Sequence, residues 1–266
     1  MSLWHDPVKD ARLDFPIETS PLDGPLAPDS PREILLTGAT GFVGAFLLAE
    51  LARQTQADIH CLVRASGKAE AQQRLQANLE RYHLWDPQQA GRIRALAGDL
   101  EQPGFGLPSS DYEALAGRVE QIFHSAAQIN HVLPYLLLKK ANVTATQEVI
   151  RFAARHRRKW LHFLSSTAAC VGQSQGRALV FPEERVHRSP TTLISAYGLS
   201  KWVAERSLEN AALAGIPVTI FRGGDMSGDS LHGLGKVTDL FHLFLRLFIE
   251  LGLRPEPLAG EINILP

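Results

Sequence analysis

Short apolar runs alternate along this chain with longer segments that have helical spacing. Six runs have the length and composition of buried strands, at residues 34–37, 58–63, 93–97, 119–124, 160–165 and 218–222. Helical segments follow four of them, at residues 43–53, 68–83, 134–156 and 195–214. Alternation of this kind predicts βαβ units. We therefore expect an α/β fold built on a doubly wound parallel sheet, with helices on both faces.

A glycine-rich turn lies between the first apolar run and the first helical segment. Gly38, Gly41 and Gly44 recur at every third position. Such a loop turns backbone N–H groups and a helix N-terminus toward an anionic ligand, where a Cβ would block a pyrophosphate. We assign the tight turn to Gly38, the close approach to Gly41, and the packing of helix on strand to Gly44. The context predicts a Rossmann-like dinucleotide site, although the spacing differs from the simplest Gly-x-Gly-x-x-Gly form.

The two ends of the chain differ in pattern from the middle. Residues 1–30 contain five prolines, which oppose regular helix and predict an extended arm or linker. Trp4, Leu13 and Phe15 would let this arm lie along the domain surface. Residues 240–253 are apolar but interrupted by charge, which predicts a well-buried helix or a docking surface.

Composition restricts the classes of function. The formal net charge of −1 argues against a nucleic-acid-binding surface, because that needs a basic excess. Two cysteines are too few for a disulfide scaffold and indicate a reducing, cytoplasmic compartment. No apolar run has the length of a membrane span, no signal peptide opens the sequence, and the histidines lack metal-ligand spacing. We expect neither a metal nor a nucleic-acid or membrane partner.

The end of the second strand indicates which dinucleotide is bound. In this fold an acidic residue there contacts the ribose 2′-OH of NAD, whereas an arginine accommodates the 2′-phosphate of NADP. Arg64 follows the second strand, and its planar guanidinium suits a phosphate, unless it is simply solvated. Asp99, after the third strand, is placed to contact the adenine, although Gly-Asp pairs also occur in turns for local reasons. The sequence therefore predicts NADPH.

Candidate chemistry lies at the start of the last helical segment. Tyr197 and Lys201 are four residues apart, so they share one face of the helix. A neighbouring ammonium lowers the pKa of a tyrosine from its usual value of about 10. The pair predicts a proton donor for an oxygen that gains charge during hydride transfer. Thr167, after the fifth strand, is expected to hold the substrate oxygen with Tyr197; local capping by loop hydroxyls is the alternative.

The glycine loop at 37–44, the hydroxyls at 165–167 and the Tyr197–Lys201 pair together resemble the extended short-chain dehydrogenase/reductase superfamily. Further matches resemble thioester reductase (R) domains of the nonribosomal peptide synthetase and carboxylic acid reductase type. These matches lie at residues 10–14, 61–65, 124–127, 141–143 and 200–205, so the resemblance spans essentially the whole chain.

The resemblance implies an activity and the residues for it. Such domains use NADPH to reduce an acyl or peptidyl thioester, held on a carrier protein's phosphopantetheine arm, to an aldehyde and in some members to the alcohol. The implied catalytic residues are Thr167, Tyr197 and Lys201. Asn142 matches the family position that supports the active-site helix and its water; a helix-surface amide is the alternative. The implied cofactor-binding residues are Thr37, Gly38, Thr40, Gly41, Phe42, Val43, Gly44, Arg64, Asp99, Leu100, Ser125, Ala126, Ala127, Asn142, Tyr197 and Lys201.

The resemblance also sets expectations for the organisation of the chain. We expect an arm at 1–30, an NADP-binding Rossmann domain at 31–230 and the start of an incomplete substrate-binding region at 231–266. Residues 262–266 look like a strand cut short. Relatives usually have Arg-Pro-Gly where this chain has Arg222, Gly223 and Gly224, and the missing proline would loosen the loop beside the nicotinamide. The implied setting is a monomeric domain of a larger synthetase, with an acyl or peptidyl carrier protein as partner.

Other functions stay open at the level of sequence. A nucleotide-sugar epimerase or dehydratase could use the same scaffold, but often has an acidic residue where Arg64 stands. A non-catalytic domain of a synthetase would bind the nucleotide without turnover. Residues 228–231 resemble a phosphopantetheine attachment site, yet they follow a strand of the sheet, whereas a carrier protein is a helical bundle. The basic run at 155–159 predicts a solvated helix end or a contact with an acidic carrier.

Overall fold

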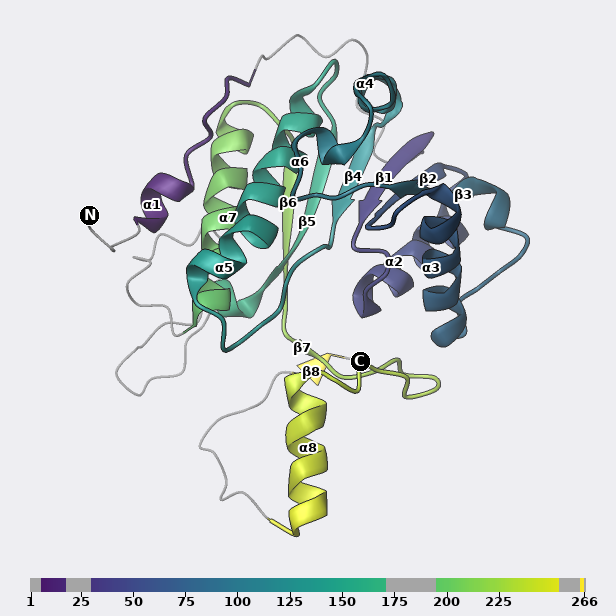
Figure 1. Ribbon diagram of the computed structural model, residues 1–266, viewed down its shortest axis with the longest axis vertical. Coiled ribbons are helices and arrows are strands. Elements are labelled where there is room, and N and C mark those ends of the chain that lie inside the picture. Colours follow the sequence, from purple (N-terminus) through teal and green to yellow (C-terminus); the bar gives the residue numbers. More distant parts are fainter. Residues whose placement is uncertain (1–5, 18–29, 171–194, 254–263, 266) are drawn as a thin grey trace.

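The centre of the molecule is a six-stranded parallel sheet with the strand order β3-β2-β1-β4-β5-β6 (Figure 1). The computed structural model describes residues 6–17, 30–170, 195–253 and 264–265. The strands are β1 (Glu33–Thr37), β2 (Asp58–Val63), β3 (Ile93–Ala97), β4 (Gln121–His124), β5 (Trp160–Ser166) and β6 (Val218–Gly223). All neighbouring strands are parallel. The predicted doubly wound sheet is confirmed, and its order reverses between β1 and β4, where such sheets bind ligands.

Helices cover the sheet on both faces, as predicted. The helices are α2 (Phe42–Gln54), α3 (Lys68–Arg81), α4 (Ser109–Arg118), α5 (Tyr135–Lys139), α6 (Ala145–Ala154) and α7 (Ala196–Leu213). Short 3₁₀ helices are η1 (Ala90–Arg92), η2 (Pro103–Gly106) and η4 (Thr167–Ala169). Alternate residues of β1 explain the two layers: Ile34 and Leu36 pack with α2 and α3, whereas Leu35 packs with α4, α6 and α7.

The long helical segment expected at 134–156 contains a local change of geometry. Between α5 and α6 the chain forms one wider π-helical turn, η3 (Lys140–Thr144). Such turns occur often at functional sites because they displace a side chain from the regular helical face. Asn142 lies within this turn and is buried.

The described part of the N-terminal arm contains more regular structure than the sequence predicts. It contains a one-turn helix, α1 (Pro7–Asp10), because Asp6 caps it and Pro7 occupies the first helical position, where proline is tolerated. The side chain of Asp10 accepts hydrogen bonds from the Tyr135 hydroxyl and the Lys139 ammonium, both at 2.7 Å. Leu13 and Phe15 pack against the main core, so the described part of the arm does lie along the domain. Trp4 lies outside the described residues.

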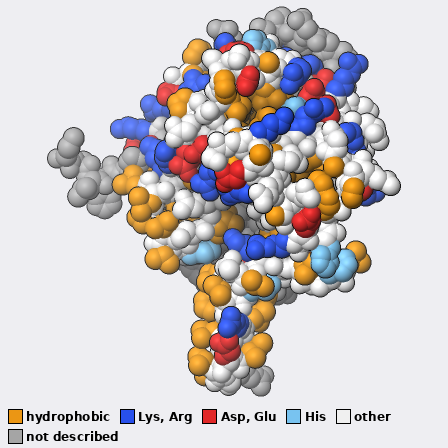
Figure 2. All heavy atoms as spheres, turned by 45° about the vertical axis from the view of Figure 1, so that its right-hand side comes forward, with side chains coloured by type: hydrophobic (Ala, Val, Ile, Leu, Met, Phe, Trp, Pro, Cys, Tyr) orange, Lys and Arg blue, Asp and Glu red, His pale blue; other side chains and the backbone are white. Residues whose placement is uncertain are grey.

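The C-terminal part projects from this body (Figure 1). Here β7 (Asp225–Met226) pairs in parallel with β8 (Ile264–Leu265), and α8 (Leu240–Leu251) lies between them in sequence. No residue of α8 is buried, and apolar side chains cover its surface (Figure 2). The expectation of a well-buried helix is therefore wrong for this chain. Among the described residues, no helix has both the length and the apolar character needed to cross a membrane.

Candidate active site

The glycine loop has the geometry expected of a phosphate-binding turn. Gly38 has a φ of +81°, and a Cβ there would lie 2.6 Å from the Ala126 nitrogen. A Cβ on Gly44 would lie 2.0 Å from the Gly38 carbonyl oxygen, so the helix can pack on the loop only without a side chain. Gly41 directly precedes α2 and donates its N–H to the Gly38 carbonyl at 2.9 Å. These close contacts match the structural roles expected for Gly38 and Gly44.

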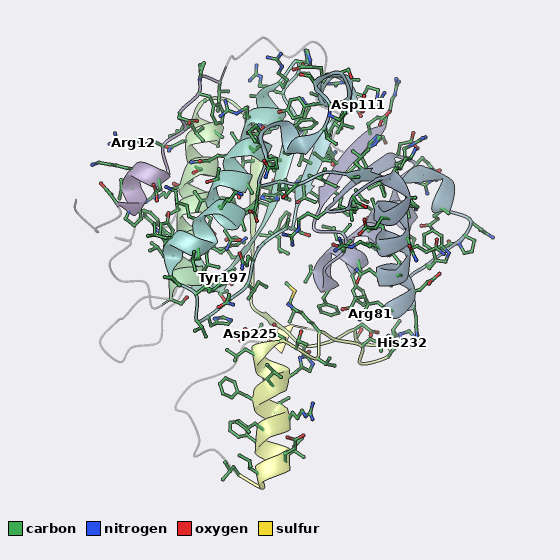
Figure 3. All side chains as sticks on the ribbon, viewed as in Figure 1. Arg12, Arg81, Asp111, Tyr197, Asp225 and His232 are labelled. Atoms are coloured by element: carbon green, nitrogen blue, oxygen red, sulfur yellow. The ribbon has the colours of Figure 1, made fainter. Side chains whose placement is uncertain are left out.

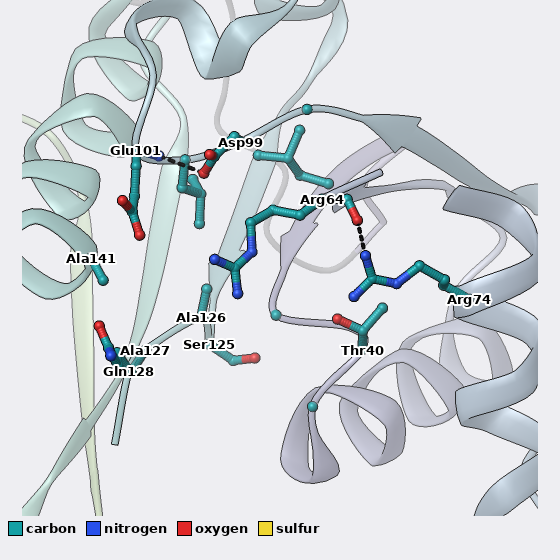
Figure 4. Close-up of a pocket in the computed structure, with 15 residues that line it drawn as sticks. Thr40, Arg64, Arg74, Asp99, Glu101, Ser125, Ala126, Ala127, Gln128 and Ala141 are labelled. Carbon is teal, nitrogen blue, oxygen red and sulfur yellow. Dashed lines mark hydrogen bonds between the residues drawn. The ribbon is translucent and has the colours of Figure 1, made fainter. Parts of the chain in front are cut away.

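A pocket of about 580 Å³ opens in front of this loop (Figure 4). Nine of the sequence-predicted cofactor residues line it: Gly38, Thr40, Gly41, Arg64, Asp99, Leu100, Ser125, Ala126 and Ala127. They come from the ends of β1, β2, β3 and β4, which the parallel sheet brings to one edge. Six more residues line the pocket without having been predicted: Leu62, Arg74, Gly98, Glu101, Gln128 and Ala141.

Two arginines line the pocket. The Arg64 side chain extends into it from the end of β2, away from Arg74, whose guanidinium reaches the Arg64 carbonyl from α3 (Figure 4). Arg74 donates a hydrogen bond to the Arg64 carbonyl, so the strand end and the helix are joined there. Both residues are exposed. Two arginines on an exposed pocket wall suit a phosphate group, because each presents several donors in one plane. The sequence offered a cue for Arg74, a basic residue on the helix after the strand.

The other predicted residues of the glycine loop do not line the pocket. Thr37 is fully buried, and its hydroxyl lies 2.7 Å from Nδ1 of His124 and accepts the Ala126 N–H at 3.3 Å. Phe42 and Val43 begin α2 and do not line the pocket. The Asp99 carboxylate accepts the N–H of Glu101 at 3.0 Å. Asp99 therefore also makes the local turn contact that the sequence offered as an alternative to binding the adenine.

Tyr197 is placed by the start of α7. The Ser195 hydroxyl accepts the Gly198 N–H at 2.9 Å and so caps this helix. A Cβ on Gly198 would lie 2.4 Å from the Ala168 carbonyl oxygen, so α7 packs closely on η4. Figure 3 labels Tyr197 near the lower end of α7. The centre of its ring lies 5.9 Å from the centre of the His131 ring. The catalytic candidates at 167, 197 and 201 therefore lie at one junction of α7 with the end of β5.

The electrostatics of Tyr197 differ from the sequence-based expectation. Burial raises its pKa to about 12, the hydrogen bond with the Ser166 side chain acts against this, and Asp239 adds to the rise. The phenol therefore holds its proton more strongly than expected, because removal from water outweighs the hydrogen bond with Ser166. Its hydroxyl partner is Ser166, whereas Thr167 is the next residue and begins η4.

Lys201 lies one helical turn further and is 2% exposed. Its ammonium donates to the Leu164 carbonyl at 2.7 Å and lies 4.0 Å from the centre of the Phe163 ring. Burial lowers its pKa to about 7, and the charge of Glu205 acts in the opposite direction. Tyr197 and Lys201 do not line the described pocket, which ends at Gln128 and Ala141.

Asn142 connects two helices inside the protein. Its amide donates to the Ser200 hydroxyl at 2.9 Å and to the Gln128 carbonyl at 3.0 Å. Its oxygen accepts the Gln128 N–H at 2.7 Å. The alternative of a helix-surface amide is therefore wrong. The side chain ties the π turn to α7, beside Tyr197, and to the loop that lines the pocket.

Two other sequence features have local explanations. Asp229 accepts N–H groups of Leu231, His232 and Leu234, so residues 228–231 form a side-chain-capped turn. In the basic run, Lys159 is buried and donates to the carbonyls of Arg155 and Arg157, which corrects the expectation of a wholly solvated segment. Among the described residues, no group of three or more His, Cys, Asp or Glu side chains could hold a metal ion.

This fold and site define an NAD(P)-binding oxidoreductase of the extended short-chain dehydrogenase/reductase class. Residues 36–266 match the NAD-binding family described as "Male sterility protein". The chain belongs to this family, together with the terminal reductase domains of peptide and polyketide synthetases.

Individual relatives support this placement. The chain is 43% identical over 239 residues to a linear gramicidin synthase protein of Brevibacillus parabrevis, a match that covers 90% of this chain and 5% of that protein. The terminal R domain from the myxalamid PKS-NRPS pathway is 39% identical with a TM-score of 0.86, covering 93% of this chain and 62% of that one. The R domain of a synthetase from Mycobacterium tuberculosis is 28% identical with a TM-score of 0.63, covering 86% and 54%. The chain thus spans less than two thirds of these relatives.

Proposed function

We propose that this chain is the NADPH-binding and catalytic part of a thioester reductase, which releases a carrier-bound acyl or peptidyl group as an aldehyde. The observation that supports this most directly is the junction of α7 and η4. There Tyr197 and Lys201 are buried beside the hydroxyls at the end of β5, and Asn142 ties α7 to the pocket loop.

The pocket fits a phosphorylated dinucleotide. Gly38 and Gly41 lie in the wall of the pocket, and Gly41 caps the N-terminus of α2, whose free N–H groups suit the pyrophosphate. Arg64 and Arg74 would hold the 2′-phosphate that distinguishes NADPH from NADH. Asp99 and Leu100 would lie against the adenine, and Ser125 to Ala127 would form the wall toward the nicotinamide.

Each catalytic side chain has a role that its surroundings favour. When bound, the dinucleotide supplies a hydride to the thioester carbonyl carbon. Tyr197 and Thr167 donate hydrogen bonds to the carbonyl oxygen, where negative charge develops. The phenol is protonated near pH 7, so it can donate this hydrogen bond. Lys201, one helical turn further along α7, would hold the nicotinamide ribose.

The products follow from the balance of the reaction. The carbonyl carbon gains a hydride and the oxygen gains a proton, giving a thiohemiacetal. Its collapse breaks the carbon–sulfur bond, leaving an aldehyde and the thiol of the phosphopantetheine arm. A second hydride and proton would give the alcohol. Aldehyde reductases of Aspergillus flavus are 35% and 36% identical to this chain, which supports reductive chemistry at a carbonyl.

The test is consumption of NADPH with an acylated carrier protein. The chain should oxidise NADPH and release an aldehyde, and Tyr197→Phe should lower kcat about a hundredfold or more while leaving NADPH affinity within about threefold. Tyr112→Phe is the matched control, since Tyr112 is a buried tyrosine of α4 whose ring packs against Phe105 and Phe152. Binding of NADPH without turnover, in a protein that spans the full length of the related R domains, would support the non-catalytic alternative, and copurified NAD with a preference for it would support the epimerase.

A further inference from the structure

A buried carboxylate lies one helical turn beyond Lys201. Glu205 is 2% exposed and accepts hydrogen bonds from three groups on two strands. The Ser165 hydroxyl, at the end of β5, donates to one of its oxygens. Arg222, at the end of β6, donates from Nη2 at 2.9 Å and from Nε at 3.2 Å. The carboxylate therefore joins α7 to the two strands that end at the catalytic junction.

The same carboxylate is electrically connected to Lys201. Lys201 and Glu205 are four residues apart on α7, a spacing that places opposite charges on one helix face. The Lys201 ammonium is held by the Leu164 carbonyl, and the next residue, Ser165, is held by Glu205. The charges of Lys201, Glu205 and Arg222 thus alternate in sign along this buried series of contacts. In a medium of low polarity such neighbours interact much more strongly than they would in water.

Other groups around Lys201 do not replace this negative charge. From β5 it meets a carbonyl and the Phe163 ring, and from β4 it faces His124, whose burial lowers its pKa to about 3 and keeps it neutral. On α7 itself, Tyr197 has a raised pKa and is neutral near pH 7. Arg222 on β6 has the same sign as Lys201. Among the described groups facing Lys201, Glu205 is therefore the one that favours the charged ammonium.

We propose that Glu205 is a positioning residue of the reductase site. Its single buried carboxylate favours the charged form of Lys201 and fixes Arg222 at the end of β6, directly before Gly223 and Gly224. This inference rests on the proposed reductase function for its catalytic meaning. It also gives the loop that follows β6 a side-chain anchor.

The test compares three variants of the full chain. Glu205→Gln removes the negative charge with little change of shape. Glu205→Gln/Arg222→Met removes both charges, so that no unpaired ion is left buried if the single variant does not fold. Glu209→Gln is the matched control, because Glu209 is on the same helix, is 12% exposed and pairs with Arg206.

The first measurement is direct and independent of turnover. The Lys201 side chain is titrated by NMR of its Cε and Nζ nuclei, where the folded chain should show a pKa of about 7. In Glu205→Gln the midpoint should fall by about one pH unit, which is a tenfold change in the protonation equilibrium. In the double variant it should fall by less, because the like charge of Arg222 is also removed. In Glu209→Gln the midpoint of the Lys201 titration should equal that of the parent protein. An unchanged midpoint in the folded Glu205 variants would overturn the proposal.

The second measurement separates positioning from a merely structural role. The pH profile of thioester reduction should move to lower pH by the same amount, with the KM for NADPH changed less than about threefold. A loss of kcat that is equal at every pH would contradict the proposal. If the parent chain reduces no thioester at all, the proposed function fails, whereas the NMR titration still decides the role of Glu205.

Discussion

The two halves of the sheet contribute to the site by different physical means. On the β1–β3 side the functional groups are backbone amides at glycine turns and the exposed arginines at 64 and 74. On the β4–β6 side they are side chains withdrawn from water, such as Asn142, Lys201 and Glu205. The first half depends on the shape of the chain, and the second depends on charges held in a low-polarity interior. Substitutions in the two halves should therefore change different measured quantities.

The halves also differ in how their faces are covered. Apolar residues of β1, β2 and β3 pack against α2 and α3. The same face of β4–β6 presents a row of aromatic rings, in which Phe123 and His162 stack at 4.5 Å and Phe221 is 52% exposed. Trp160 Nε1 and His162 Nδ1 are buried there without a hydrogen-bond partner among the described residues. Among the described residues, the β1–β3 half is thus packed on both faces and the β4–β6 half on one.

The largest expected effect is on the shape-dependent half. Gly44→Ala would place a methyl group 2.0 Å from the Gly38 carbonyl oxygen, so the loop or the helix must move. We expect unfolding free energy to fall by about 3 kcal/mol, the upper range for overpacking, and dinucleotide binding to be lost. Denaturant unfolding and NADPH titration measure both. Gly117→Ala, in α4 with open space around its Cβ position, should be neutral or stabilising; equal losses in both variants would contradict the close-packing argument.

The next effect distinguishes phosphate recognition from general affinity. Removing Arg64 or Arg74 takes one charged donor from the pocket wall, worth about 2 kcal/mol, which is roughly a thirtyfold rise in the Kd for NADPH. The Kd for NADH should change little, because it lacks the 2′-phosphate. Arg53→Ala is the control, since Arg53 is on the surface of α2 and pairs with Glu50. If the Kd values for NADPH and NADH rise equally, these arginines do not determine the preference for NADPH.

The sequence predicted the architecture well because strand and helix periodicities are local. The ranges 58–63 and 93–97 coincide with β2 and β3, and α7 begins after the Ser195 cap at the expected place. The helix α4 was missed, since its apolar positions at Tyr112, Leu115 and Ala116 follow a loop rich in glycine and proline. The π turn was missed as well, because helical periodicity alone does not reveal one inserted residue.

The sequence predicted the parts of the site that backbone geometry forms. It predicted less well the charge states of side chains, which depend on burial. Glycine spacing and strand ends identified most of the pocket wall. The predicted direction of the Tyr197 pKa shift was wrong, since burial raises this pKa and the sequence does not give the depth of a side chain. For the same reason the burial of Lys159 and the Glu205–Arg222 pair could not be foreseen. Tertiary packing, and not the local pattern, decides these charges.

A smaller effect concerns acid stability of the buried half. His124 is fully enclosed between the hydroxyls of Thr37 and Thr146, and burial lowers its pKa from 6.5 to about 3. As the pH falls, His124 is therefore protonated in the unfolded chain before it is protonated in the folded chain. The contribution of neutral His124 to stability is fully present above pH 6.5 and is lost as the pH falls toward 3. The slope should reach about 1.4 kcal/mol per pH unit. His124→Gln should show a flatter pH dependence in denaturant titrations, whereas the exposed His83→Gln should keep the parent slope.

The smallest expected effect is at Phe221 and tests the uneven coverage of the sheet. Phe152, a fully buried residue of α6, is the reference, and Phe152→Ala should lower the unfolding free energy by about 3 to 5 kcal/mol. Phe221 exposes half of its surface, so Phe221→Ala removes little burial and should change stability by less than about 1 kcal/mol. Denaturant midpoints of the two variants measure the difference directly. A loss at Phe221 as large as that at Phe152 would mean that the aromatic row is covered in solution, and the contrast between the two halves would then be one of chemistry alone.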